Sequence, residues 1–217
     1  MKLTVATDTE ELDLSHTMYD GGPLRGEAFV GLTNLRLLDL GGNRFTSSSL
    51  PVELTSLPNL ESLILVGTEM GGPLNLEFLL GMPSIVECWL DGVPIEGGIP
   101  PEIGSVTTLG SLSLINCGLT GAIPAELGNL SILKRLWLSN NRLQGVVPPE
   151  LGRIPEMEVL RVEGNNLQGQ VSDEICQHRG PIERIGALGV LGTDCHSDGN
   201  VVCSCCSCCG PACGASG

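Results

Sequence analysis

Residues 109–132 read LGSLSLINCGLTGAIPAELGNLSI, and residues 133–156 read LKRLWLSNNRLQGVVPPELGRIPE. These are two aligned copies of one 24-residue unit, and MEVLRVEGNNLQGQVSDEI at 157–175 begins a third. Looser copies begin at positions 9, 35, 60 and 85, so that seven units follow one another at intervals of 24 to 26 residues. A unit of this length cannot bury its own apolar face, so the repeat predicts units stacked around a shared core.

Each unit opens with the pattern x-x-L-x-L, as in Leu112 with Leu114 and Leu136 with Leu138. Alternate residues of a strand point to opposite faces, so these leucines predict a short strand with one face toward a core. The pattern L-x-G-x-I-P-x-x-L-G-x-L follows at Leu119–Leu130 and Leu143–Ile154. Proline cannot continue the interior of a sheet. We therefore expect extended or 3₁₀ segments, rather than full α-helices, on the outer side of each coil.

A polar position follows each strand, five residues after its first leucine. It holds asparagine in three units, at Asn43, Asn141 and Asn165. A buried asparagine there can bond the backbone as the chain leaves the strand, and stacking turns the bonds into a ladder. Three other units carry residues that can do part of this work, namely Thr17, Thr68 and Cys117. Val93 cannot, so we expect a weaker or water-filled rung in that unit.

Together these residues resemble the leucine-rich repeat family in its plant-type 24-residue form. The resemblance covers seven repeats over residues 9–175. It implies a leucine-rich repeat solenoid, a right-handed superhelix with a parallel β-sheet on its concave face and extended or 3₁₀ segments on its convex face. Residues 1–8 are expected to be a partial N-terminal end or the mark of a truncation, which would also account for the absence of a secretory signal.

The C-terminal end departs from the repeat. Residues 176–202 are interpreted as a degenerate last coil and cap, and residues 203–217 as a cysteine-rich tail. The D-C-x(7)-C-x-C-C-x-C-C pattern resembles the cysteine-rich caps of leucine-rich repeat proteins from diatoms and related algae. Cys176 and Cys195 flank the degenerate coil as natural disulfide partners. The disulfide candidates are Cys176, Cys195, Cys203, Cys205, Cys206, Cys208, Cys209 and Cys213.

Two main interpretations of this tail stay open, beside a third in which it is lipid-modified or disordered. A disulfide-bonded cap suits an oxidising compartment, whereas closely spaced thiolates also suit a soft metal ion. Eight cysteines permit 105 pairings, so the sequence does not give the connectivity.

Composition excludes several classes of function. The 217 residues carry 11 Lys and Arg against 25 Asp and Glu, a net charge of −14, which disfavours nucleic acid and acidic membranes as partners. No apolar run reaches the roughly 18 residues of a membrane span. No catalytic or phosphate-binding motif occurs, so we expect neither enzymatic activity nor a cofactor.

The residue between the two strand leucines of each unit points outward, onto the concave face. Both tryptophans of the chain, Trp89 and Trp137, occupy this position two units apart, with Ser113 between them. Tryptophan at a solvent-facing position gains no core packing and is enriched in binding hot spots. The sequence therefore predicts a ligand groove, with these residues on its surface: Trp89, Ser113, Trp137, Asp91, Asn116, Lys134, Arg135 and Arg161. The alternative is that the tryptophans only shield the sheet.

The resemblance implies a non-catalytic binding module, receptor-like or inhibitor-like, at the cell surface or outside the cell. A protein, peptide or glycan would be its ligand, with a co-receptor as a further partner. The alternatives are a structural protein that binds a solid surface and a metal-binding protein that acts through the tail. The sequon Asn129-Leu130-Ser131 makes Asn129 a glycosylation candidate.

Overall fold

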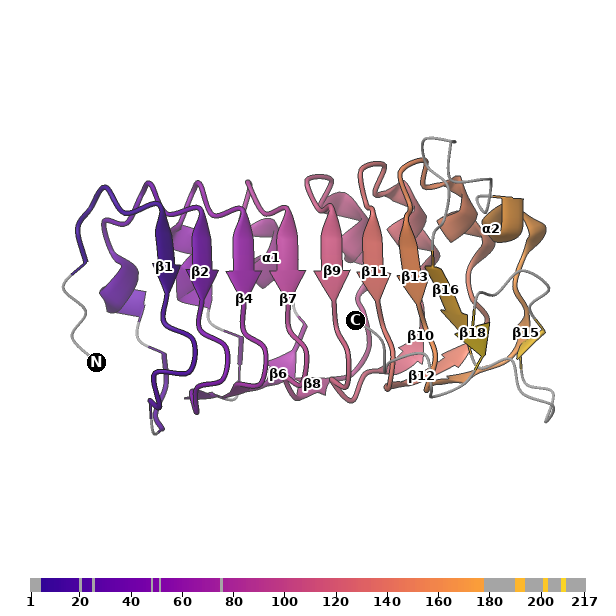
Figure 1. Ribbon diagram of the computed structural model, residues 1–217, viewed down its shortest axis with the longest axis horizontal. Helices are drawn as coiled ribbons and strands as arrows, with labels where there is room; N and C mark the ends of the chain where they lie inside the picture. Colours follow the sequence, from indigo (N-terminus) through magenta and orange to yellow (C-terminus); the bar gives the residue numbers. More distant parts are fainter. Residues whose placement is uncertain are drawn as a thin grey trace.

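The computed structural model is a stack of coils that forms an elongated solenoid (Figure 1). The structure describes residues 5–19, 21–24, 26–47, 49–50, 52–74, 76–177, 190–193, 201–202 and 208–209. Every described coil contributes one strand to a common sheet on one side, and the chain returns along the other side before the next strand begins.

The sheet is parallel and follows the order of the chain. Its nine strands are β1 (Glu11–Asp13), β2 (Leu37–Asp39), β4 (Ser62–Ile64), β7 (Glu87–Trp89), β9 (Ser111–Ser113), β11 (Arg135–Trp137), β13 (Val159–Arg161), β16 (Val190–Thr193) and β18 (Cys208–Cys209). From β1 to β13 the register places equivalent residues of neighbouring coils opposite one another, as for Leu112 and Leu136. The predicted solenoid with one parallel sheet is therefore confirmed. We call the outer surface of this sheet the concave face.

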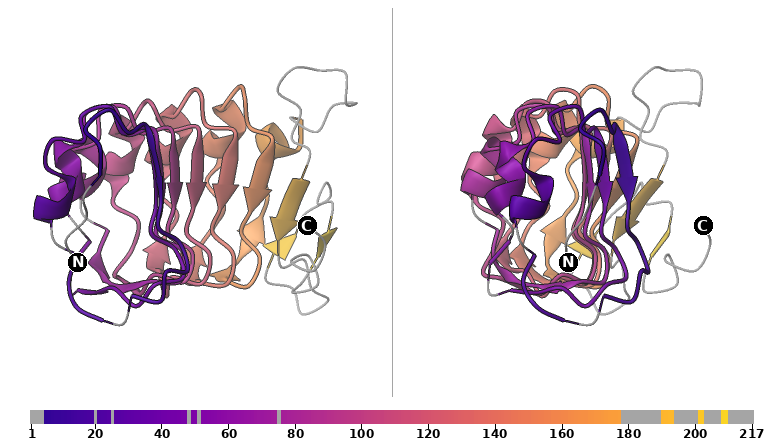
Figure 2. Two further views of the ribbon diagram at one scale, coloured as in Figure 1. Left: turned by 60° about the vertical axis from the view of Figure 1, so that its left-hand side comes forward. Right: turned by 90° about the vertical axis from the view of Figure 1, so that its left-hand side faces the viewer.

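The opposite, convex side consists mainly of short 3₁₀ helices, as the proline pattern predicts (Figure 2). They are η1 (Gly26–Phe29), η2 (Val52–Ser56), η3 (Pro101–Ser105), η4 (Ala125–Asn129) and η5 (Pro149–Arg153). Two coils instead carry a short α-helix, α1 (Leu76–Leu80) and α2 (Asp173–Gln177). Proline directly precedes η3, η4 and η5 and imposes the extended approach to each of them.

Smaller parallel sheets join the coils along the edge between the two sides. One contains β10 (Thr120–Ala122), β12 (Arg142–Gly145) and β14 (Asn166–Leu167). The other three pair β3 (Thr46–Ser47) with β5 (Glu69–Met70), β6 (Gly72–Pro73) with β8 (Ile95–Glu96), and β15 (Gly169–Gln170) with β17 (Val201–Val202). The sequence did not predict these strands.

The core is a column of leucines with a polar ladder beside it. Leu112, Leu114, Leu136 and Leu138 are fully buried, as the alternation predicts. Asn141 donates from Nδ2 to the carbonyl oxygens of Leu114 (2.7 Å) and Leu138 (2.9 Å). Its Oδ1 accepts from the backbone N–H groups of Cys117 (2.9 Å) and Leu119 (3.1 Å).

The remaining rungs follow the same plan. Asn43 bonds the carbonyl oxygens of Leu14 and Leu40, and Asn165 those of Leu138 and Val162. Where the asparagine is replaced, a shorter side chain makes fewer bonds: the hydroxyl of Thr68 donates to Leu65 O at 2.9 Å.

The rung that contains Val93 is completed from the next coil. Val93 is fully buried and offers no side-chain donor. The carbonyl oxygen of Leu90 instead accepts the Cys117 thiol, with Sγ at 3.1 Å, and the backbone N–H of Val93 at 3.0 Å. A thiol is a weak donor, which agrees with the expectation of a weaker rung.

The two core cysteines are predicted to be unreactive in the folded protein. Burial raises the pKa of Cys88 to about 12, and burial together with the Asp91 carboxylate raises the pKa of Cys117 to about 12. Because the thiolate is the nucleophile, N-ethylmaleimide at neutral pH should leave both residues unlabelled until urea unfolds the chain. Peptide mapping by mass spectrometry reads each cysteine separately. Labelling of the native protein as fast as of the unfolded protein would contradict this burial.

Most of the cysteine-rich end lies outside the described residues. Cys176 is disulfide-bonded, and the backbone of Cys208 and Cys209 forms β18. Cys195, Cys203, Cys205, Cys206 and Cys213 belong to the undescribed part. The pairing of these cysteines, the cap and the boundaries at 1–8, 176–202 and 203–217 therefore stay predictions. Among the described helices, none has the length and apolar character that a membrane crossing requires.

Candidate functional site

The outward-facing residues of the sheet form straight columns across the coils. The strand register aligns one column over β1, β2, β4, β7, β9, β11 and β13, and it reads Asp13, Asp39, Ile64, Trp89, Ser113, Trp137 and Arg161. The predicted positions of the two tryptophans on this face are therefore where the structure has them. Both side chains are partly exposed.

The two tryptophan rings contact each other across the coil that separates them. Strands two apart in a sheet lie roughly 10 Å from each other, yet the ring centroids of Trp89 and Trp137 are 5.0 Å apart with an interplanar angle of 35°. The rings lean toward each other above β9. Ser113 lies in the middle of this arrangement and is only 1% exposed. The prediction of Ser113 on the surface of the groove is therefore wrong, because the serine is buried beneath the contact between the two rings.

A second bridge crosses the same coil in the neighbouring column. Arg135 donates from Nη2 to Glu87 Oε1 at 3.0 Å and from Nε to Ser111 Oγ at 3.0 Å. Its guanidinium carbon lies 6.0 Å from the ring centroid of Trp137, within the range of a cation–π contact. Ser111 is 2% exposed. Arg135 is therefore held in place on the face, and its charge is shared with a carboxylate.

Asp91, two residues after Trp89, lies in a third column and bonds to the coil that contains β9. Its Oδ1 accepts the Ser113 hydroxyl at 2.5 Å and the backbone N–H of Ile115 at 2.9 Å. The small residues of β9 thus serve as supports for side chains from the coils on either side. The side chains that reach over β9 are Trp89, Asp91, Glu87, Arg135 and Trp137, and they are preorganised by these contacts.

The last complete coil adds charged groups beside Trp137. Arg161 pairs in register with Trp137, and Glu163 is 4% exposed and accepts the Ser139 hydroxyl at Oε1, at 2.9 Å. The Nε atom of Arg161 and the Oε2 atom of Glu163 are buried without a hydrogen-bond partner.

Two predicted residues lie at the rim and not beside the aromatic pair. Lys134 is exposed and precedes β11. Asn116 is exposed in the turn after β9, with a left-handed φ of 55°, and its backbone N–H donates to Ser139 O at 3.0 Å. Asn116 thus occupies a turn position where other coils have glycine, such as Gly92. The left-handed backbone accounts for an asparagine at this position, so no ligand contact is needed to explain it.

Glu87 and Ser111 were expected only as outward-facing neighbours of the tryptophan column, and the bridge that Arg135 makes to them was not predicted. Their signal is the same as that of the tryptophans, because Glu87 and Arg135 also stand two units apart in one column with a serine between them. Asn129 is exposed at the end of η4. Its glycosylation stays a prediction.

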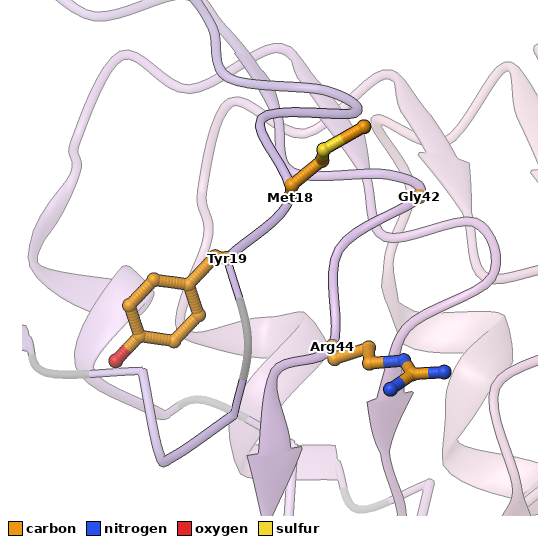
Figure 3. Close-up of a pocket in the computed structure, with 4 residues that line it drawn as sticks. All are labelled: Met18, Tyr19, Gly42 and Arg44. Atoms are coloured by element: carbon orange, nitrogen blue, oxygen red, sulfur yellow. The ribbon is translucent and has the colours of Figure 1, made fainter.

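A separate hollow of about 390 Å³ lies between the first two coils, far along the solenoid from the aromatic pair (Figure 3). It is lined by Met18, Tyr19, Gly42 and Arg44. The Tyr19 ring stacks on Phe45 with centroids 4.7 Å apart. Figure 3 shows the Tyr19 and Arg44 side chains pointing away from each other, so the hollow does not gather polar groups around a common point. Within the described part of the chain, no group of three or more metal-ligating side chains is found.

The contact between the tryptophans is predicted to give a spectroscopic signature. Rings this close and mutually tilted couple their electronic transitions, so the circular dichroism spectrum should contain an exciton couplet near the main indole absorption band. Trp89→Phe and Trp137→Phe should each abolish the couplet, because one indole alone cannot produce it. Val146→Ala, an exposed residue outside the concave face, is the control and should keep it. A couplet that survives either tryptophan substitution would contradict the pair.

Known proteins resemble this chain in sequence and in structure. The Leucine Rich Repeat family model matches residues 34–57, 108–130 and 133–154. Receptor-like protein 39 of Arabidopsis thaliana is 34% identical over 89 residues, which cover 41% of this chain and 10% of that protein.

Two solved structures extend the similarity over most of the chain. The first is the ectodomain of the plant membrane receptor kinase GASSHO1/SCHENGEN3 from Arabidopsis thaliana, in complex with CASPARIAN STRIP INTEGRITY FACTOR 2. It has a TM-score of 0.74 and 31% identity, over 94% of this chain and 23% of that chain. The second, Pollen Receptor Kinase 3, has a TM-score of 0.60 and 30% identity over 67% of this chain and 68% of that one. The chain thus spans about a tenth of the curated relative and less than a quarter of the first receptor.

Proposed function

The chain belongs to the leucine-rich repeat family, and from that premise we propose that it is a receptor-like module that binds a polypeptide ligand on its concave face. The binding surface is centred on Trp89 and Trp137. The residues that flank the pair are Asp91, Arg135 and Arg161, with Asn116 and Lys134 at the rim. No catalytic step is part of this proposal.

The observation that carries the proposal is the partly exposed tryptophan pair. The large side chains beneath the sheet are leucines that are already fully buried, so the pair adds nothing to the core. Exposed, preorganised aromatic side chains bordered by charged groups are characteristic of binding hot spots. The contacts to Ser113, Ser111 and Glu87 hold these groups in place before any ligand arrives.

The relatives support a polypeptide ligand and a location at the cell surface or outside the cell. GASSHO1/SCHENGEN3 is a plant membrane receptor kinase whose ectodomain was solved with CASPARIAN STRIP INTEGRITY FACTOR 2 bound. Nothing comparable supports a glycan, so the proposal keeps the protein or peptide ligand of the three that the sequence left open.

The test is to capture secreted peptides of the source organism on the immobilised protein and to identify them by mass spectrometry. Three forms are compared: the wild type, the double variant Trp89→Ala/Trp137→Ala, and Val146→Ala as a matched surface control. We expect at least one peptide that the wild type and Val146→Ala retain and the double variant loses. Retention of the same peptides by all three forms, or by none, would refute the proposal.

A further inference from the structure

The concave face changes chemical character along the solenoid. In the column that contains the tryptophans, β1 and β2 carry carboxylates, β4 an isoleucine, β7 to β11 the aromatic pair, and β13 an arginine. A ligand that lies along this column therefore meets negative charge, then apolar surface, then positive charge.

The two carboxylates on β1 and β2 occupy positions that are expected to destabilise the sheet. Asp13 and Asp39 stand opposite each other in register, and like charges directly opposite each other destabilise a sheet. Each is fixed by a backbone N–H group two residues later, from Ser15 and Gly41, both at 2.8 Å. The hydrogen bonds from Ser15 hold the pKa of Asp13 below its ordinary value, so this carboxylate stays charged.

Among the charges near this pair, His16 favours the charged form of Asp13 less than the hydrogen bonds from Ser15 do. Arg36, which precedes β2, donates from Nε and Nη2 to the two carboxylate oxygens of Glu61, at 3.1 and 2.9 Å. Glu10 and Glu11 add exposed negative charge next to Asp13. Folded proteins commonly retain such locally destabilising arrangements at functional sites.

In the same column the far end carries a positive charge, while Glu163 lies one column away with Oε1 bonded to the Ser139 hydroxyl. Arg161 adjoins Trp137 in the register, and Lys134 is exposed at the rim before β11. A positively charged ligand segment would be attracted to the first coils and repelled from these two residues. The charge distribution therefore sets the direction of a ligand on the face.

We infer that the ligand is an extended polypeptide segment with an apolar side chain on the Trp89–Trp137 pair and lysine or arginine side chains over Asp13 and Asp39. This inference rests on the proposed function and adds the chemistry of the ligand to it. Asp39 lies two strands and Asp13 three strands from Trp89, which is roughly 10 and 14 Å. An extended chain rises about 3.3 Å per residue, so the basic residues stand about three or four positions from the apolar anchor.

The test uses three synthetic peptides without tryptophan. The first has two arginines, a short Gly-Ser spacer and a leucine at this distance; the second replaces the arginines with glutamates; the third replaces the leucine with serine. Each is made in both chain directions. Trp89 and Trp137 are the only tryptophans of the chain, so intrinsic fluorescence reports binding at the pair alone.

We expect the first peptide, in one direction, to bind at least about tenfold more tightly than the other two. Asp13→Asn/Asp39→Asn should weaken it by about three- to tenfold, and so should an ionic strength of about 0.5 M, where the Debye length is about 4 Å. Glu96→Gln is the matched control, since Glu96 is exposed on β8, outside the face, and it should leave the affinity unchanged.

Other outcomes separate the inference from the proposed function. Equal or tighter binding of the acidic peptide at the tryptophans overturns the inference and leaves the proposed function standing. Tryptophan fluorescence that does not change with any of the three peptides also overturns the inference. So does binding of calcium alone that depends in the same way on Asp13 and Asp39. The proposed function itself fails when captured ligands bind irrespective of Trp89 and Trp137, or when no peptide is captured.

Discussion

Replacement of Asn141 by alanine is expected to lower the free energy of unfolding by about 3 kcal/mol. Asn141 accepts the backbone N–H groups of Cys117 and Leu119 and donates to the carbonyl oxygens of Leu114 and Leu138. Leu138 O keeps a partner in Asn165, but the other three groups lose the bond that Asn141 supplies. Buried backbone groups left without partners cost about 1–3 kcal/mol each, which makes this single substitution one of the most damaging that the chain offers.

The measurement is urea denaturation followed by circular dichroism and tryptophan fluorescence. Asn129→Ala, produced without glycosylation, is the matched control. Asn129 is exposed and makes no side-chain hydrogen bond in the described residues, so its loss should change the free energy of unfolding by less than about 0.5 kcal/mol. An equal effect of the two substitutions would show that the ladder does not hold the coils together.

Replacement of Gly104 by alanine is expected to destabilise the stack by about 3 kcal/mol, the upper end of the range for overpacking. Gly104 belongs to the L-G pattern of the convex side, and a Cβ atom there would lie 2.3 Å from the carbonyl oxygen of Glu126 in the next 3₁₀ helix. Since the obstacle is backbone, the coils must separate to accept the methyl group. Gly128 repeats the arrangement, 2.7 Å from the carbonyl oxygen of Glu150.

Gly110→Ala serves as the control for this substitution. A Cβ atom at Gly110 would meet the Val86 side chain at 3.3 Å, with backbone no nearer than 3.7 Å, so a small side-chain movement accommodates it. Urea denaturation should therefore separate the two variants by about 2 kcal/mol. Equal stability of Gly104→Ala and Gly110→Ala would contradict the close packing of η3 against η4.

The sequence predicted the architecture because its signals are local and repeated. Alternation fixes which face of each strand is buried, as for Leu136 and Leu138, and proline before the convex segment excludes a long helix. The asparagine ladder was also predicted residue by residue, since Asn43, Asn141 and Asn165 recur at a fixed distance from the strand. The edge strands, such as β10 and β12, were missed because they depend on backbone pairing between turns and carry no alternation of their own.

The candidate site was predicted only in part. The column position places Trp89 and Trp137 on one face, and the register confirms that placement. Their closure above Ser113 depends on side-chain rotamers that span two coils, which a repeat period does not encode. The same holds for the bridge from Arg135 to Glu87, which connects residues 48 positions apart. A search for paired large residues on either side of a small one would have found both bridges.

The most direct test of Trp89 and Trp137 as the binding site is the affinity of a captured peptide for the Trp89→Ala/Trp137→Ala variant, compared with the wild type and Val146→Ala. Isothermal titration calorimetry measures this dissociation constant without relying on tryptophan emission. Loss of both anchors is predicted to weaken binding at least about 100-fold, with Val146→Ala unchanged. A dissociation constant that stays within about threefold of the wild-type value in the double variant would place recognition elsewhere on the molecule.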